Sequence, residues 1–109
     1  MSKKPIKEDP VELEIPDGVA TGNQSVEVMR AWIVDGSMMV SLNADAFGDR
    51  VIDWGRILGE IAHHVARSAK LQGHMSEAEA LQAVHNGFDS TMLANQPAMS
   101  GKVRGRVNH

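Results

Sequence analysis

The stretch SVEVMRAWIVDGSMMVSLNAD, residues 25–45, predicts two β-strands joined by a tight turn. The dipeptide Asp35-Gly36 stands between two apolar segments, and this is the strongest short-range signal of a two-residue β-hairpin. With these two residues as the loop, Trp32 lies directly opposite Met39. The other pairs predicted by this register are Val34–Ser37, Ile33–Met38, Ala31–Val40 and Met29–Leu42.

Both faces of the predicted hairpin are apolar, because side chains alternate between the two faces of a strand. One face carries Met29, Ala31, Ile33, Met38, Val40 and Leu42. The opposite face carries Val28, Arg30, Trp32, Val34, Ser37, Met39, Ser41 and Asn43. An isolated two-stranded sheet is marginal in water, so each face needs cover from elsewhere.

Two amphipathic helices are predicted after the hairpin. The first begins at the N-cap Asp49, carries an apolar stripe at helical spacing and ends at Gly73, which can adopt the left-handed conformation. The second begins at the Ser76 capping box and ends before Pro97. The linker between them is short, so the two helices should be antiparallel neighbours.

These elements predict an α+β fold. We expect an antiparallel β-hairpin followed by two antiparallel α-helices packed on one sheet face, with the sheet extended or covered by dimerisation. The single ββαα domain spans residues 25–96, after an extended or disordered arm over 1–24 and before a disordered basic tail over 97–109. Within the arm, the alternating segment Val11–Ile15 fits a third strand, an arm laid on a partner, or an unstructured acidic segment.

Composition restricts the functional classes. The chain has 109 residues, 42% of them hydrophobic and 23% charged, a formal net charge of −3 and no cysteine. A mildly acidic chain argues against a dedicated nucleic-acid binder, and the absence of cysteine removes disulfides, thiol catalysis and cysteine-based metal sites. The basic start has no apolar segment behind it, and no segment approaches membrane-spanning length. We therefore expect a cytoplasmic protein with no membrane partner.

The polar motifs have structural interpretations. Glu60 and His63 match the E-x-x-H pattern of di-iron bundles, but one copy on a polar helix face lacks the remaining carboxylates. His85 and Asp89 lie four residues apart, as in a general-base pair, although no nucleophile accompanies them. We interpret His85 as a partly buried histidine held by a carboxylate. The sequence thus predicts no catalytic residues, no metal site and no cofactor.

One flank of the first helix is lined by small residues: Gly55, Gly59, Ala62 and Ala66. Glycine inside a helix costs about 1 kcal/mol relative to alanine, and close approach of another backbone is the usual reason for it. We expect the sheet or the second helix to pack closely along this flank.

No dedicated segment remains to cover the hairpin face that carries Val28, Trp32, Val34 and Met39, so we predict that these residues form an interface. A symmetric homodimer is the simplest arrangement, either through sheet edges or through stacked Trp32 faces. The favoured function is a small non-enzymatic homodimer that binds an unknown protein partner or stabilises an assembly. The alternative is a small-molecule binding domain or weak enzyme, in which Arg30 and Trp32 hold an anionic ligand at the dimer interface.

The segments EVMRAWIVDGSMMVSL and DWGRILGEIAHHVA, within residues 27–71, resemble a family of short uncharacterised bacterial proteins, mostly from alphaproteobacteria. The resemblance rests on the R-A-W-I-V-D-G hairpin and on the W-G start of the first helix. The family is a domain of unknown function, so the resemblance implies no activity, cofactor or site residues. It does imply a bacterial cytoplasmic origin.

Overall fold

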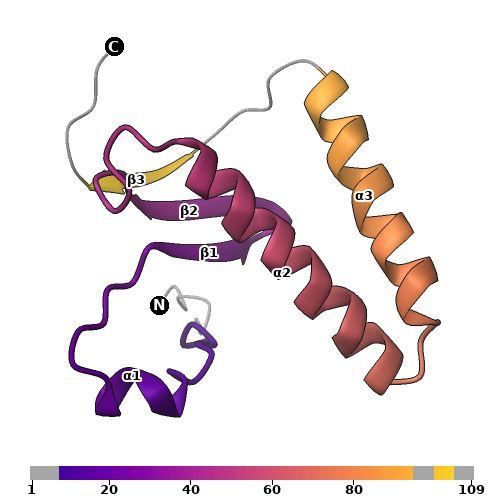
Figure 1. The fold of residues 1–109 in the computed structure, drawn as a ribbon, viewed down its shortest axis with the longest axis horizontal. Coiled ribbons are helices and arrows are strands. Elements are labelled where there is room, and N and C mark those ends of the chain that lie inside the picture. Colours follow the sequence, from indigo (N-terminus) through magenta and orange to yellow (C-terminus); the bar gives the residue numbers. More distant parts are fainter. Residues whose placement is uncertain (1–7, 95–99, 105–109) are drawn as a thin grey trace, which may run out of the picture.

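The computed structural model describes residues 8–94 and 100–104 (Figure 1). These residues form three strands, two long helices and one short helix. In order they are α1 (Asp17–Thr21), β1 (Met29–Val34), β2 (Ser37–Asn43), α2 (Ile52–Leu71), α3 (Glu77–Leu93) and β3 (Ser100–Arg104). The predicted α+β class, with an antiparallel hairpin followed by two helices, is confirmed.

The β1–β2 hairpin has the predicted register. Trp32 pairs with Met39, and the pairing runs without interruption from Met29↔Leu42 to Val34↔Ser37. At the turn, Asp35 has φ 50° and Gly36 has φ 85°. Positive φ at both central residues is the conformation of a type I′ turn, whose twist matches that of the flanking strands.

β3 extends the sheet on the β2 side, so the strand order is β1-β2-β3. It runs parallel to β2, with Met39 opposite Ser100 and Asn43 opposite Arg104. The disordered tail predicted from residue 97 is therefore wrong for residues 100–104, while residues 97–99 and 105–109 lie outside the described ones. Parallel strands need a long crossover connection, and here α2 and α3 lie within it.

The N-terminal arm differs from its prediction in one respect. Residues 8–16 adopt no regular secondary structure, so the segment Val11–Ile15 is not a strand, but α1 adds one helical turn at residues 17–21. Pro16 lies at the N-cap of this turn and Gly22 at its C-cap. Residues 1–7 of the arm lie outside the described part of the chain.

Local capping signals determine where the long helices end. Ser76 Oγ accepts a hydrogen bond from the Glu79 amide at 3.1 Å, which is the predicted cap of α3. After α2, Gly73 has φ 77°, and the amides of Gly73 and His74 donate to the carbonyls of Lys70 and Ala69, both at 3.0 Å. This pair of bonds is a Schellman motif, which stops the helix.

The start of α2 lies later than predicted. Its N-cap is Val51, which has no side-chain cap, and Asp49 contributes only its carbonyl, which accepts from the Val51 amide at 2.9 Å. A carboxylate is nevertheless present at this end of the helix, where it forms ion pairs. Asp53, in the first turn, lies 3.0 Å from Arg50 Nε and 3.3 Å from Arg56 Nη1.

α2 and α3 run in opposite directions and pack against each other (Figure 1). Their contact contains Ala66, which is fully buried, and Ala80, which is 4% exposed. These two alanines are the only buried residues within residues 8–94. Small side chains let the two backbones approach closely, but they bury little apolar area.

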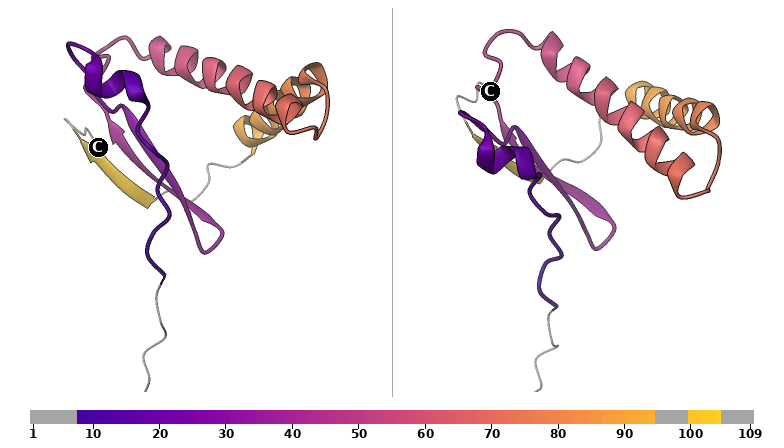
Figure 2. Two further views of the ribbon diagram at one scale, coloured as in Figure 1. Left: turned by 90° about the horizontal axis from the view of Figure 1, so that it is seen from below. Right: turned by 60° about the horizontal axis from the view of Figure 1, so that its bottom comes forward.

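The helical pair, α2 and α3, does not pack on the sheet. In the described residues no Cα atom of α2 or α3 comes within 8 Å of a Cα atom of a strand. Figure 2 shows the hairpin and α2 diverging from their common linker, so that an open angle separates them. The expectation of two helices packed on one sheet face within one chain is therefore corrected.

The linker between β2 and α2 holds this open angle. Consecutive turns cover residues 44–49, with amide-to-carbonyl bonds from Ala46 to Asn43 at 3.0 Å and from Gly48 to Asp45 at 3.2 Å. Phe47 and Trp54 meet edge to face with ring centroids 5.2 Å apart. A tight linker anchored by an aromatic pair sets the direction in which α2 leaves the sheet.

Candidate interaction surface

Large apolar side chains are exposed over much of the described chain. On the sheet, Ile33 is 74% exposed and Met38 is 59% exposed. The helices add an exposed set of their own: Leu58, Ile61 and Val65 on α2, and Phe88, Met92 and Leu93 on α3. Exposed apolar surface of this extent is typical of an interaction surface rather than of a self-contained small domain.

Of the four residues predicted to form an interface, Trp32, Val34 and Met39 lie on one face of the hairpin, as the register requires. Val28 directly precedes β1, and its carbonyl accepts from the Asn43 amide at 2.9 Å. Val28 and Trp32 are half-buried, while Val34 is 42% and Met39 38% exposed. The structure thus brings Trp32 and Met39 together and leaves this face exposed to solvent near the turn, at Val34.

The N-terminal arm shares this region of the sheet. Arg30 Nη2 donates to Glu27 Oε2 at 3.2 Å, and Arg30 Nη1 lies 4.0 Å from Glu12 Oε2 in the arm. A cavity of about 600 Å³ lies here. Its lining includes Arg30 and Trp32 together with the arm residues 11–16. Glu12 and Glu14 alternate with apolar residues in the arm. Their carboxylates were the sequence signal from which a contact with a basic residue on a strand could have been predicted.

The opposite face of the hairpin is the more exposed one at its tip. Near the linker Met29, Val40 and Leu42 are half-buried, whereas Ile33 and Met38 beside the turn are mostly exposed. This face was expected to lie under the helices. Its exposure increases with distance from the linker, in step with the divergence of the hairpin from α2 (Figure 2).

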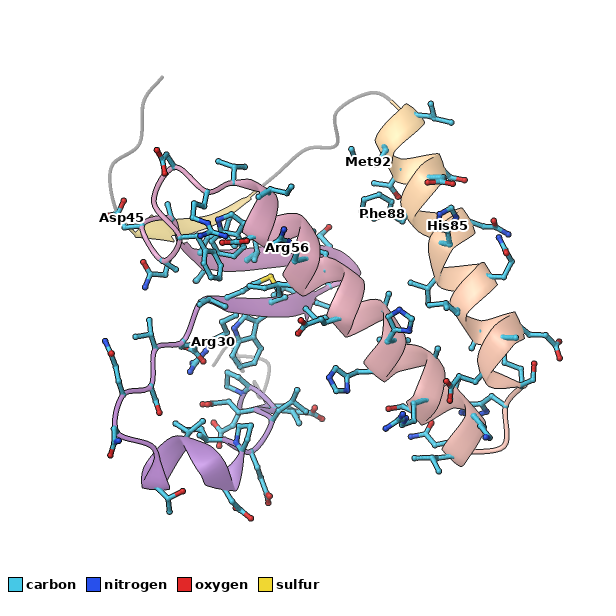
Figure 3. All side chains as sticks on the ribbon, viewed as in Figure 1. Arg30, Asp45, Arg56, His85, Phe88 and Met92 are labelled. Carbon is cyan, nitrogen blue, oxygen red and sulfur yellow. The ribbon has the colours of Figure 1, made fainter. Side chains whose placement is uncertain are left out.

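The helical pair presents the second apolar surface. Figure 3 shows Phe88 and Met92 projecting from the side of α3 that is nearer to α2 and the sheet. Phe88 is 50% exposed and Met92 is 69% exposed, and no described Cα atom of α3 lies within 8 Å of one in the sheet. On α2, Leu58 is 45% and Val65 is 47% exposed.

The small-residue flank of α2 meets α3 over half of its length. Ala66 is buried and Ala62 is half-buried. Gly55 and Gly59 are exposed, and a Cβ atom added at either would meet no atom within 4 Å. The predicted close packing therefore holds for the alanines and fails for the glycines within a single chain.

The polar motifs form no multi-residue site in the described residues. His85 Nδ1 lies 3.2 Å from Asp89 Oδ2, but the side chains are 66% and 53% exposed, so the predicted partial burial of His85 is wrong (Figure 3). Glu60 and His63 are exposed on α2. Nowhere in residues 8–94 do three or more histidine or carboxylate side chains gather in a way that could hold a metal ion.

A helix must be long and apolar to span a membrane. Of the helices that the structure describes, none has both the length and the apolar content needed to cross a bilayer.

Comparison with protein families is informative over most of the chain. The family described as "Domain of unknown function (DUF5076)" matches residues 12–95. The chain belongs to this family. The match covers the arm from Glu12, the hairpin and both long helices, and the expected membership of a family of unknown function is confirmed.

A solved structure resembles this DUF5076 chain over nearly its whole length. It is described as that of a "putative pyruvate dehydrogenase" from the photosynthetic bacterium Rhodopseudomonas palustrus CGA009. The two chains are 27% identical, and the TM-score is 0.67 over 92% of this chain and 96% of the other. No curated protein matches the DUF5076 chain.

Proposed function

We propose that this DUF5076 protein is a non-enzymatic homodimer that serves as a protein-interaction or assembly module. The observation that carries the proposal is the burial of only two side chains, Ala66 and Ala80, in residues 8–94. A folded chain normally needs a larger apolar core to offset the conformational entropy that it loses. A second copy of the chain buries the exposed apolar side chains without requiring any other component.

The exposed apolar side chains support a second copy. In the single chain Ile33 is 74% exposed, Met38 is 59% exposed and Phe88 is 50% exposed. Large apolar side chains exposed on both the sheet and the helices are typical of an extensive, obligate interface.

The ionic contacts support an assembly role over catalysis. Each ion pair of the long helices joins residues three or four apart in sequence and lies at the surface, as between His85 and Asp89 or between Asp53 and its two arginines. Such pairs stabilise helices, whereas a catalytic site brings together groups from several elements. The apolar surfaces are the features that remain to be explained.

Light scattering after size-exclusion chromatography tests the proposal. The full chain should elute with twice its monomer mass of 11.8 kDa. Trp32→Glu places a charge on the half-buried face and should shift the protein toward the monomer mass. Gln24→Glu adds the same charge to an exposed loop and should leave the dimer intact. A monomeric wild-type chain contradicts the proposal, and a folded, dimeric Trp32→Glu variant excludes an interface centred on Trp32.

A second candidate function is the binding of a small anion beside Arg30 and Trp32. The cavity of about 600 Å³ favours it. The carboxylates of Glu27 and Glu12 compete for the same guanidinium, so an anion would have to displace them. The name of the similar R. palustrus protein makes pyruvate the first anion to try.

Thermal unfolding with millimolar pyruvate tests this candidate, because a ligand that binds only the folded state raises the unfolding temperature. Glu12→Gln removes one competing carboxylate and should enlarge the shift, while Arg30→Ala should abolish it. A wild-type chain without any shift, and a Glu12→Gln variant without any shift, would together exclude this anion site.

A further inference from the structure

Among the residues that the structure describes, two apolar surfaces of each chain have no partner within that chain. The first is the hairpin tip, with Ile33 and Met38. The second is the helical pair, with Leu58 and Val65 on α2 and Phe88 on α3. Both surfaces lie on elements that diverge from the same linker (Figure 2).

The two surfaces are complementary in chemistry. The sheet surface consists of branched and flexible apolar side chains, and the helical surface consists of an aliphatic stripe with an aromatic ring beside it. A helix packed on a sheet buries surfaces of this type, and the removal of each large apolar side chain from water stabilises the contact. The amphipathic pattern of the sequence is thus that of helices packed on a sheet.

The linker opposes this packing within one chain. Closing the angle would have to change the turns over residues 44–49, in which Gly48 has φ 58°, and the edge-to-face contact of Phe47 with Trp54. It would also move the first turn of α2, where Asp53 pairs with Arg50 at 3.0 Å. An exchange between two copies forms the same helix-on-sheet contacts and leaves the linker unchanged.

We infer that the helical pair of each copy covers the sheet of the other copy. This inference rests on the proposed homodimer and adds to it a contact through the hairpin face that carries Ile33 and Met38, opposite to the Trp32 face. A two-fold axis makes the exchange reciprocal. The sheet surface and the helical surface of each copy are therefore both covered in one closed dimer. Only Ala66 and Ala80 are buried in residues 8–94, and this small core favours a second copy as the occupant, because one exchange covers both unpartnered surfaces of each chain.

Site-specific crosslinking tests the exchange, and the chain has no native cysteine to interfere. One copy carries Met38→Cys at the hairpin tip, and a second copy with a distinguishing tag carries Val65→Cys on α2. The two are refolded together and treated with a short bifunctional maleimide. The matched control replaces Val65→Cys by Arg67→Cys, which lies two residues away on the charged side of the same helix.

The exchange predicts a covalent pair of the two differently tagged copies as the main product, and a marked loss of this product with Arg67→Cys. A chain that carries both Met38→Cys and Val65→Cys should give linked dimers. If that chain instead gives only internally linked monomers, its own helices close on its own sheet and the inference is wrong.

The oligomeric state separates this inference from the proposed function. A dimer by light scattering that gives no mixed crosslink, with either Met38→Cys or Ile33→Cys as the sheet position, overturns the exchange and leaves the homodimer standing. A monomer by light scattering overturns both.

Discussion

Trp32 on β1 lies directly opposite Met39 on β2, in a register set by the Asp35-Gly36 turn. The pair places an indole and a flexible thioether on one face, where sulfur–aromatic contact is favourable. The same register places Ile33 and Met38 together on the other face. One two-residue turn therefore determines the composition of both surfaces of the hairpin.

The turn should be sensitive to side-chain shape at Gly36, which has φ 85°. Gly36→Val should lower the free energy of unfolding by about 1–2 kcal/mol, because a β-branched residue is strained in the left-handed region. Gly36→Asn should cost much less, since asparagine tolerates this conformation. Urea denaturation of the two variants measures the difference, and equal losses would contradict the type I′ turn.

Two glycines in the helical region should respond to alanine in opposite directions. Gly87 lies within α3 with open space around an added Cβ, so Gly87→Ala should raise the free energy of unfolding by about 0.5–1 kcal/mol. Gly73 has φ 77°, so Gly73→Ala should lower it by about 1 kcal/mol. Thermal unfolding at one fixed protein concentration compares them, and changes of the same sign would be inconsistent with these helix boundaries.

The α3 cap can be tested in isolation. Ser76→Ala removes the oxygen that accepts from the Glu79 amide at 3.1 Å and should cost about 1 kcal/mol of stability. Ser68→Ala, in the interior of α2, should be neutral or slightly stabilising because alanine is the better helix former. If the two variants lost equal stability, Ser76 would have no capping role.

Ile33→Asp distinguishes a lone chain from the exchanged dimer. In one chain Ile33 is 74% exposed, and an exposed substitution changes stability by less than about 0.5 kcal/mol. Under a partner's helices the same carboxylate would be buried without a partner, and the dimer dissociation constant should rise at least about ten-fold, which corresponds to 1.4 kcal/mol. Sedimentation velocity over a dilution series measures the constant. Val26→Asp, outside the strands, serves as the control and should not change it.

Features determined by short-range chemistry could be predicted from the sequence. The hairpin register follows from Asp35-Gly36, and the α3 start follows from Ser76, since both depend on backbone conformations that a few residues decide. The family of unknown function was also recognised correctly from the hairpin and the start of the first helix.

Features determined by distant contacts could not be predicted. β3 pairs in parallel with a strand more than 50 residues earlier, and the five residues SGKVR carry no alternating apolar pattern that would reveal it. The direction of α2 depends on the contact of Phe47 with Trp54, which periodicity does not encode. The described part of the arm reaches the candidate surface through the pair of Glu12 with Arg30 and through the cavity that residues 11–16 line. For these reasons the Trp32 face was expected to be uncovered, although the arm lies beside it.

The central claim is that a second copy completes this fold, and the concentration dependence of thermal unfolding tests it most directly. When folding and association are coupled, the unfolding temperature depends on protein concentration. We predict that the midpoint for the full chain rises steadily over a hundred-fold increase in protein concentration. A cooperative transition whose midpoint is the same at every concentration, in a chain of monomer mass, would contradict the claim.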